Sequence, residues 1–240
     1  MKQNIGFRIF KDFKRPDPEV IQKFAGIPSS NIGDCLNRLY NMRSNLVPFN
    51  DKPLLGPAFT VKAPCGDNLV TQKALDLAKP GDIIVIDAEG CRDRSIFGEM
   101  MVNYAVMRGI GGFIVDGAVR DADALQRLPI PVYAISVTPQ GPYKHGPGEI
   151  NVPIACGGQV VCPGDILVGD MDGIVVIKPE WVDELLPEAV KKHESEEATL
   201  RKRAAADEKE KAEMVRKHIE KWAGVLDKAG AQYYDFWEGE

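Results

Sequence analysis

Hydrophobic and polar positions follow two different periods along the chain. Between residues 59 and 177, short aliphatic runs bounded by glycine, proline or acidic residues predict buried strands. Segments between these runs place apolar residues three or four positions apart, as helices do. Because helices alternate with buried strands, the pattern predicts an α/β fold rather than an all-β fold. The predicted helices cover 18–24, a stretch running through 36 and 39, 71–78, 97–108 and a short segment after residue 120, and the predicted strands cover 59–63, 112–115, 132–137 and 174–177.

One short pattern occurs twice. Residues 80–90 and 163–173 both begin with Pro-Gly-Asp, continue as an aliphatic run and end in acidic residues and glycine. Each copy predicts a tight turn that leads into a buried strand. Two copies indicate two strands of similar role in one layered domain, because a solenoid needs at least three repeats. The segment 138–153, rich in proline and glycine, predicts a loop long enough to cover a site.

The character of the chain changes at Pro179. From there to Lys221, Glu, Lys, Ala and Arg dominate, and Glu/Lys pairs at helical spacing predict a long charged helix, interrupted near Pro187. We therefore expect an α/β domain over 1–178 and a charged helical extension over 179–240. Trp222 and the aromatic run 233–237 predict a docking surface in this extension, most simply a contact with a neighbouring subunit.

Composition excludes several classes of protein. The 240-residue chain has 44% hydrophobic residues, enough for a substantial core, and a net charge of −5. It has no basic patch with interleaved aromatic residues, so we expect no nucleic-acid partner. Long apolar runs are missing, and residues 1–15 are too charged for a secretory signal. We expect no membrane partner and a cytoplasmic location.

The cysteines are widely spaced, and none forms a Cys-x-x-Cys pair of the kind found in zinc sites and redox couples. We expect small buried hydrophobic side chains or inert thiols, with no disulfide framework. The five residues concerned are Cys35, Cys65, Cys91, Cys156 and Cys162.

The stretch from Gly98 to Asp121 carries the strongest chemical signal. A helix that begins after Gly98 presents free backbone N–H groups, at about Glu99 to Val102, to a small carboxylate or phosphate. Arg120 adds a planar guanidinium that binds such an anion in bidentate geometry. Asp121 adds a hard oxygen ligand suited to Mg²⁺ or Mn²⁺. This stretch is a candidate anion and metal site.

Structural interpretations of the same residues stay open beside the chemical one. Asp121 also suits the N-cap of the following helix, Arg120 and Glu99 also suit a buried ion pair, and Asp116 with Gly117 also suits a simple turn. His145 is a weaker candidate, placed in the loop predicted to cover a site. The sequence 109–112, Gly-Ile-Gly-Gly, follows a helix, whereas a dinucleotide-binding fingerprint must follow a strand.

Several motifs in order resemble the class II 4-hydroxy-4-methyl-2-oxoglutarate/4-carboxy-4-hydroxy-2-oxoadipate aldolases and their relatives, the RraA-like proteins. The resemblance covers about residues 29–179. The whole series is far more specific than any one motif. The matching motifs are Gly56-Pro57-Ala58-Phe59-Thr60-Val61, Gly66-Asp67-Asn68, Pro80-Gly81-Asp82, Gly98-Glu99, Asp116-Gly117-Ala118-Val119-Arg120-Asp121 and Pro163-Gly164-Asp165.

The resemblance implies an αββα sandwich of the swivelling-domain type, assembled as a homotrimer or homohexamer with the active site at a subunit boundary. Catalytic members carry an acidic residue, twenty further positions and then Arg-Asp, and Glu99-x20-Arg120-Asp121 is similar to that pattern. The family expects another acidic residue after two to four intervening positions, whereas here only Ala122 separates Asp121 from Asp123. Noncatalytic relatives that bind ribonuclease E lack the acidic set, so its presence here favours an enzyme.

The resemblance implies a metal-dependent lyase that cleaves a 4-hydroxy-2-oxo acid to pyruvate and a second 2-oxo acid. The substrate carboxylate would lie against Arg120 and the backbone of Gly98, Glu99, Met100 and Met101. Asp121 would hold Mg²⁺ or Mn²⁺ directly, with Glu99 acting through water and as a catalytic residue together with Arg120. The nearest alternative is an oxaloacetate decarboxylase, which forms the same pyruvate enolate, and a further alternative is a noncatalytic regulator that binds a protein partner.

Overall fold

The computed structural model describes residues 4–234, which divide into two compact units between His193 and Glu194. Of the aromatic run predicted to dock, residues 235–237 lie outside the described residues, while Tyr233 and Tyr234 are exposed. The first unit is an α/β domain, and the second is helical. In the described part of the chain, no helix is both long and apolar enough to cross a membrane.

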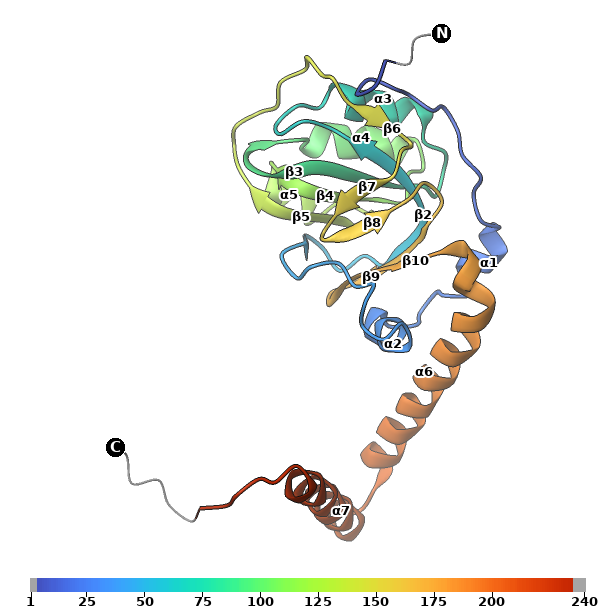
Figure 1. Cartoon of the computed structure of the whole chain (residues 1–240), viewed down its shortest axis with the longest axis vertical. Coiled ribbons are helices and arrows are strands. Elements are labelled where there is room, and N and C mark those ends of the chain that lie inside the picture. Colours follow the sequence, from blue (N-terminus) through green and yellow to red (C-terminus); the bar gives the residue numbers. More distant parts are fainter. Residues whose placement is uncertain (1–3, 235–240) are drawn as a thin grey trace. The chain divides into compact units, whose positions relative to one another are not determined.

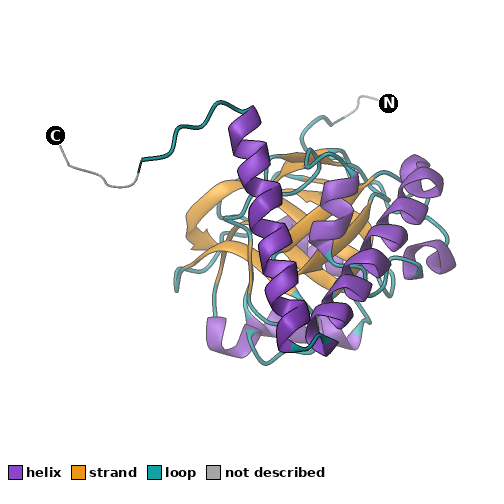
Figure 2. Ribbon diagram, turned by 90° about the horizontal axis from the view of Figure 1, so that it is seen from below, coloured by secondary structure: helices purple, strands orange, loops and turns teal. Residues whose placement is uncertain are grey.

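The first unit is built on one sheet with strand order β1-β5-β4-β3-β2-β9-β10, and β6 also pairs with β2 (Figure 1, Figure 2). Strands β2 to β5 run parallel to one another, while β9 and β10 continue the sheet antiparallel. A separate hairpin joins β7 to β8. The strands are β1 Val47–Pro48, β2 Leu54–Lys62, β3 Ile83–Ser95, β4 Gly112–Val119, β5 Val132–Val137, β6 Glu149–Ile150, β7 Ile154–Cys156, β8 Gln159–Val161, β9 Ile166–Asp170 and β10 Gly173–Ile177.

Buried side chains of the sheet and of the elements that cover it form three hydrophobic clusters. On one face, α3, α4 and α5 pack against alternate residues of the parallel strands, among them Phe59, Ile84 and Phe113. The opposite face packs against the β7–β8 hairpin. The remaining helices of the unit, with the first turns of α6, pack on β9 and β10. The helices are α1 Pro18–Gln22, α2 Ser29–Cys35, α3 Leu69–Leu77, α4 Glu99–Met107, α5 Ala122–Leu125, η1 Pro179–Trp181, α6 Val182–Ala205 and α7 Glu208–Lys228.

The two Pro-Gly-Asp copies lead into β3 and β9, which are the strands on either side of β2. In each copy the aspartate closes its own turn, because its carboxylate accepts a hydrogen bond from the backbone N–H three residues earlier. Both carboxylates are also buried and paired with a cation, Asp82 with Arg15 and Asp165 with Lys178. The repeated sequence therefore produces the same local structure at two places beside one strand.

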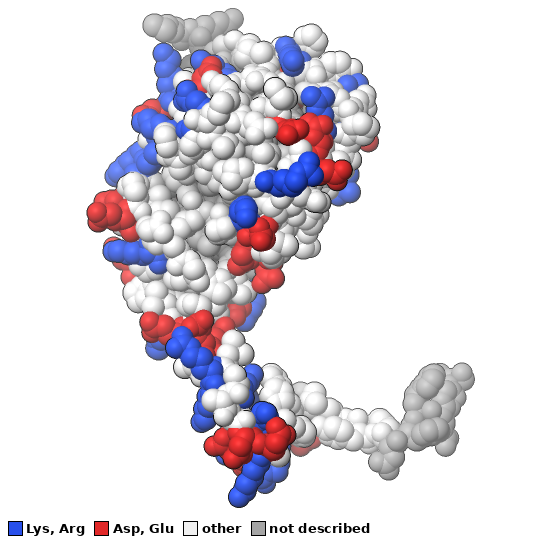
Figure 3. Space-filling model, turned by 180° about the vertical axis from the view of Figure 1, so that it is seen from behind, with Lys and Arg blue, Asp and Glu red and all other residues white. Residues whose placement is uncertain are grey.

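The predicted helical extension breaks at a different place. Helix α6 runs through Pro187, so the prediction of an interruption there is wrong. A helical proline removes one backbone hydrogen bond, and the burial of Leu185 and Ala189 on either side of Pro187 holds the helix in register. The break falls at Ala206, where Asp207 and Glu210 form a capping box that begins α7. Both signs of charge are intermixed over the extension (Figure 3).

Two cysteines are paired, so the expectation of no disulfide is wrong. Cys65, in the loop after β2, is joined to Cys91 of β3, 26 positions later. Local spacing carries no sign of this bond, because β3 continues well beyond its predicted apolar run and brings Cys91 beside the loop. Cys156 is a buried free thiol whose pKa is raised, mainly by burial.

The buried Asp82–Arg15 pair gives a test of the fold. Arg15→Ala is expected to lower the free energy of unfolding by about 3 kcal/mol, because it leaves a buried carboxylate without its cation. Lys79→Ala is the control, since its pair with Asp12 is exposed at both ends and contributes less than about 1 kcal/mol. Urea unfolding of both variants measures the difference. If both variants lost the same free energy of unfolding, the buried Asp82–Arg15 pair would contribute no more than an exposed one.

Candidate active site

The end of β4 and the start of α4 lie side by side. The Arg120 N–H donates to the carbonyl oxygen of Phe97, just before Gly98, the N-cap residue of α4. Asp121 then turns back in the left-handed backbone conformation, with φ of 59°. Its Oδ2 atom accepts a hydrogen bond of 3.0 Å from the Glu99 N–H. The structure therefore brings Glu99, Arg120 and Asp121 together, although twenty residues separate the first two.

Gly98 allows this approach because it lacks a side chain. A Cβ atom there would lie 2.1 Å from Asp121 Oδ2 and 2.7 Å from Arg120 Cγ. The φ of Gly98, −145°, is extended and open to any residue, so the requirement is steric rather than conformational. The glycine thus fixes how closely the two charged side chains approach the positive end of the α4 dipole.

The Arg120 side chain is half-exposed, but its Nε atom is buried and has no hydrogen-bond partner among the described residues. Asp121 Oδ2 lies 3.6 Å from this nitrogen, which is beyond good hydrogen-bond distance. An unpaired guanidinium N–H is a strong donor that lacks an acceptor. The buried Nε is out of reach of a ligand, so it is the exposed end of the Arg120 guanidinium that is available to an anion.

A cavity of about 300 Å³ adjoins these residues. Four of the predicted site residues line it, namely Gly98, Met100, Met101 and Arg120. Glu99 and Asp121 are exposed beside it and are linked to each other by the hydrogen bond described above. The other lining residues are Asn68, Gln72, Phe97, Gly141, Pro142 and Lys144.

Sequence reasoning missed the polar residues Asn68, Gln72 and Lys144 in this wall. Asn68 is 2% exposed, its amide nitrogen donates to the carbonyl oxygen of Ile96, and its Oδ1 has no partner among the described residues. It lies in the Gly66-Asp67-Asn68 motif, which was the available signal. Lys144 lies in the proline- and glycine-rich loop predicted to cover a site, and it brings a second cation to the cavity.

The structure also tests the purely structural roles considered for Asp121, Arg120 and Asp116. Asp121 occupies the N-cap position of α5, but its side chain does not cap that helix and bonds to the start of α4 instead. Among the described residues, Arg120 pairs with Asp121 rather than with Glu99. Asp116 belongs to β4, where its carboxylate accepts from the Gly157 N–H at 2.9 Å.

Two carboxylates are available for a divalent cation. The described residues contain no group of three or more His, Cys, Asp or Glu side chains placed to hold a metal. Asp121 is half-exposed, and a carboxylate has capacity beyond the single bond to Glu99. This donor set fits Mg²⁺ or Mn²⁺, which keep several waters when one or two carboxylates hold them.

Asp67 holds the loop that bears Lys144. Burial would raise the pKa of this carboxyl group, but hydrogen bonds from the Leu69, His145 and Gly146 N–H groups outweigh it and lower the pKa below its ordinary value. His145 donates through its backbone, and its ring stacks on Tyr143 outside the cavity wall. Asp123 is exposed in the first turn of α5.

Three comparisons identify related proteins. A family model described as RraA-like, Aldolase/RraA, matches residues 29–176. A protein from Halalkalibacterium halodurans, provisionally named as a 4-hydroxy-4-methyl-2-oxoglutarate aldolase, is 43% identical over 190 residues, which are 79% of this chain and 90% of that protein.

Solved structures share the fold. An RraA-family protein from Streptomyces coelicolor, described as an unusual member of the RNase ES inhibitor family, has a TM-score of 0.68 at 27% identity over 78% of this chain and 98% of its own. The Thermus thermophilis RraA, described as an RNA-processing inhibitor, has a TM-score of 0.58 at 27% identity over 62% of this chain and 91% of its own. These neighbours confirm the predicted α/β fold of the RraA-like type.

Gly98→Ala tests the close approach of Asp121. We expect the free energy of unfolding to fall by about 1–3 kcal/mol, because the new methyl group must displace Asp121 or Arg120. Amide hydrogen exchange should also speed up at Glu99, which loses its acceptor. Gly224→Ala, where nothing lies within 4 Å, is the control and should stabilise α7 by about 0.5–1 kcal/mol. Unchanged exchange at Glu99 would rule out this steric role.

The lowered pKa of Asp67 predicts acid opening of the loop. Its contribution to stability is present above the unfolded value of about 3.9 and is lost as pH falls through the lower folded value. Between pH 6 and pH 3, protection factors at His145 and Gly146 should therefore decrease. Asp67→Asn should weaken protection at pH 6 and flatten this profile, whereas exposed Asp76→Asn should leave it as in the parent protein. A parent profile that is flat to pH 3 would contradict the prediction.

Proposed function

Because this chain belongs to the RraA-like family, we propose that it is a divalent-metal-dependent class II aldolase. The substrate would be a 4-hydroxy-2-oxo acid such as 4-hydroxy-4-methyl-2-oxoglutarate or 4-carboxy-4-hydroxy-2-oxoadipate, and the products would be pyruvate and a second 2-oxo acid. The name of the Halalkalibacterium relative supports this class of reaction.

One observation carries the proposal. Arg120 and the start of α4 share a cavity of about 300 Å³, and Asp121 is bonded to the first N–H of that helix. The expected free N–H groups are largely engaged, because Asp121 accepts from Glu99 and the Gly98 carbonyl oxygen accepts from Met101 and Val102. A cation and a carboxylate beside one pocket, at the positive end of the α4 dipole, still suit a small 2-oxo acid better than a neutral ligand. The same residues form the Glu99-x20-Arg120-Asp121 pattern.

In this proposal the substrate carboxylate binds to the terminal nitrogens of the Arg120 guanidinium, whose side chain is 43% exposed. The backbone at Gly98, Glu99, Met100 and Met101 forms the adjoining wall. Lys144 offers a second cation to the part of the substrate beyond C4. The pocket would thereby orient both ends of a dicarboxylate before the bond breaks.

Asp121 would hold Mg²⁺ or Mn²⁺ directly and Glu99 would do so through water, and the bound cation would act as a Lewis acid. Glu99 orients a water that takes the proton of the 4-hydroxyl group. The C3–C4 bond then breaks, C4 becomes a carbonyl carbon, and the electron pair moves to the enolate of pyruvate. Arg120 stabilises the negative charge on the enolate, and the proton taken from the 4-hydroxyl group returns from the same water to C3 to give pyruvate.

Decarboxylation of oxaloacetate is the nearest alternative reaction, because loss of CO₂ leaves the same pyruvate enolate. A regulatory role is the candidate from another class, and it is favoured by the two structural neighbours described as inhibitors of RNA processing. A homotrimer or homohexamer, with a neighbouring subunit completing the pocket, belongs to the same proposal.

Pyruvate release, coupled to lactate dehydrogenase, tests the aldolase. We expect turnover of 4-hydroxy-4-methyl-2-oxoglutarate with Mg²⁺ or Mn²⁺ and none with EDTA. Arg120→Ala should lower kcat/KM by about 10²–10³-fold, because it removes a charge that stabilises the enolate, and Asp121→Ala should abolish turnover. Asp123→Ala is the matched control, since this neighbouring carboxylate is exposed on α5.

The ratio of the rates with this substrate and with oxaloacetate separates aldolase from decarboxylase. A folded Asp121→Ala protein with full activity would overturn the metal site. Absence of pyruvate from either substrate, together with no binding of Mn²⁺, would favour the regulator.

A further inference from the structure

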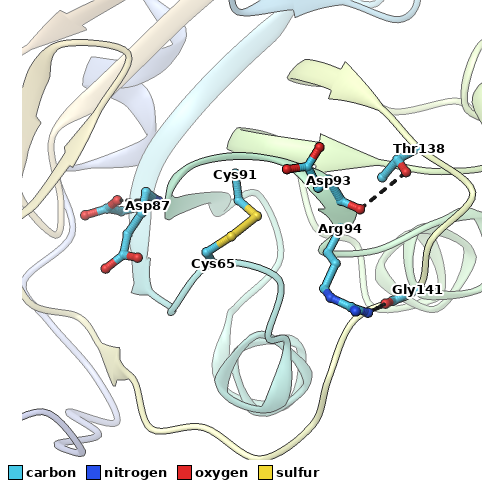
Figure 4. Close-up of a disulfide and its surroundings, with 8 residues drawn as sticks. Cys65, Asp87, Cys91, Asp93, Arg94, Thr138 and Gly141 are labelled. Atoms are coloured by element: carbon cyan, nitrogen blue, oxygen red, sulfur yellow. Dashed lines mark hydrogen bonds between the residues drawn. A yellow bond between two sulfur atoms is a disulfide. The ribbon is translucent and has the colours of Figure 1, made fainter.

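The disulfide lies next to the wall of the candidate active site. Cys65 precedes the Gly66-Asp67-Asn68 motif, and Asn68 lines the cavity. Cys91 lies in the distal half of β3, three residues before Arg94 (Figure 4). The bond therefore joins the two chain segments that approach the cavity from the ends of β2 and β3.

The distal half of β3 has little regular pairing to hold it. Register shifts interrupt its ladder with β4 between Asp87 and Cys91 and again between Cys91 and Ser95. Glu89 and Gly90 both have positive φ, with values of 58° and 69°. A covalent link at Cys91 fixes a segment that the sheet itself holds only at isolated positions.

Both joined segments grip the loop over the cavity. From the Cys91 side, the Arg94 guanidinium donates to the Gly141 carbonyl oxygen at 3.2 Å (Figure 4). The same guanidinium lies 4.0 Å from the Tyr143 ring centroid. The Ser95 Oγ donates to the Gln140 carbonyl oxygen at 2.9 Å. Through Gly141 these contacts reach the cavity wall.

From the Cys65 side, backbone hydrogen bonds also hold the loop, at Tyr143. The Gly66 carbonyl oxygen accepts from the Tyr143 N–H at 2.8 Å, and the Asn68 N–H donates to the Tyr143 carbonyl oxygen at 3.0 Å. A Cβ atom on Gly66 would lie 2.6 Å from Arg94 Cβ, so the two segments also pack directly on each other. Tyr143 is thus held between the two segments that the disulfide joins.

We propose that the Cys65–Cys91 disulfide is a redox clamp, which holds the loop 138–146 in place over the cavity when oxidised and releases it when reduced. This inference rests on the proposed function only for its effect on turnover. The release itself is a property of the fold.

The reducing partner is a dithiol. One of its thiolates attacks Sγ of Cys65, the exposed member of the pair, and Cys91 leaves as a thiolate that takes up a proton. The second thiol of the reagent then displaces the Cys65 sulfur, which is also protonated. Two electrons and two protons pass to the protein, and the reagent becomes a cyclic disulfide.

The test compares protein treated with oxidised glutathione and protein treated with dithiothreitol. Peptide mapping after alkylation is expected to find Cys65 joined to Cys91 only in the first sample. Hydrogen exchange of residues 138–146 should be faster in the second. The KM for 4-hydroxy-4-methyl-2-oxoglutarate should rise about five- to tenfold on reduction, because substrate binding must then also order the loop.

Two variants sharpen the result. The Cys65→Ser/Cys91→Ser protein should show fast loop exchange and a high KM in both treatments. Cys162→Ser, which removes a free thiol distant in sequence from the clamp, should respond to dithiothreitol as the parent protein does. A response that persists in the double serine variant would assign the effect to the reagent and overturn the clamp.

The two proposals fail separately. Equal loop exchange and equal KM in both treatments, or no Cys65–Cys91 peptide after oxidation, would overturn the clamp. Absence of turnover in both treatments would count against the aldolase, while the exchange of residues 138–146 would still decide whether the disulfide holds the loop.

Discussion

The pairing of strand β2 with its neighbours joins the parallel and antiparallel parts of the sheet in the α/β unit. This strand pairs with β3 on one side and with β9 on the other, and its far end also pairs with β6. Seven of its nine residues are buried, as expected for a central strand covered on both faces. At Gly56, strand β2 lies so close to the turn before β3 that there is no room for a side chain. A Cβ atom on Gly56 would lie 2.4 Å from the Gly81 carbonyl oxygen. Because β3 and β9 both pair with β2, this strand also sets the positions of the buried Asp82 and Asp165, which precede them.

Parallel pairing of β2 to β5 explains why the candidate site gathers residues from distant parts of the sequence. The carboxyl ends of parallel strands meet at one edge of the sheet, which is where ligands bind in open α/β proteins. Here Asn68 follows β2, Arg94 lies in the distal half of β3, Arg120 follows β4, and the loop with Lys144 follows β5. Each of the four strands therefore contributes one part of the pocket or of its support.

The sequence predicts this arrangement where the signal is periodic or is a fixed spacing. Apolar runs located the central strands, and β5 matches its predicted range of 132–137. The stretch from Gly98 to Asp121 was predicted to bring Arg120 and the start of its helix to one anion site, and the structure does place the end of β4 beside the start of α4. The distal half of β3 escaped prediction, since its polar residues 89–94 resemble a loop and its pairing is irregular.

Contacts between loops could not be read from periodicity at all. Asn68, Lys144 and the Cys65–Cys91 bond depend on how loops after different strands meet, and no local pattern encodes that distance. A motif resemblance marked Asn68 without giving its role. The contacts of residues in loops could therefore be identified only from the three-dimensional structure.

Helix α6 belongs to both compact units, because Val182, Leu185 and Ala189 are buried against β9 and β10 while the helix continues past His193. Its first turns are constrained in sequence by a core, whereas its later turns are exposed and carry local contacts such as the Arg201–Glu197 ion pair. During evolution such a helix can lengthen by whole turns between this core and α7 without exposing the core. A helical module can be added to this α/β fold in this way, with a few charged residues for each turn.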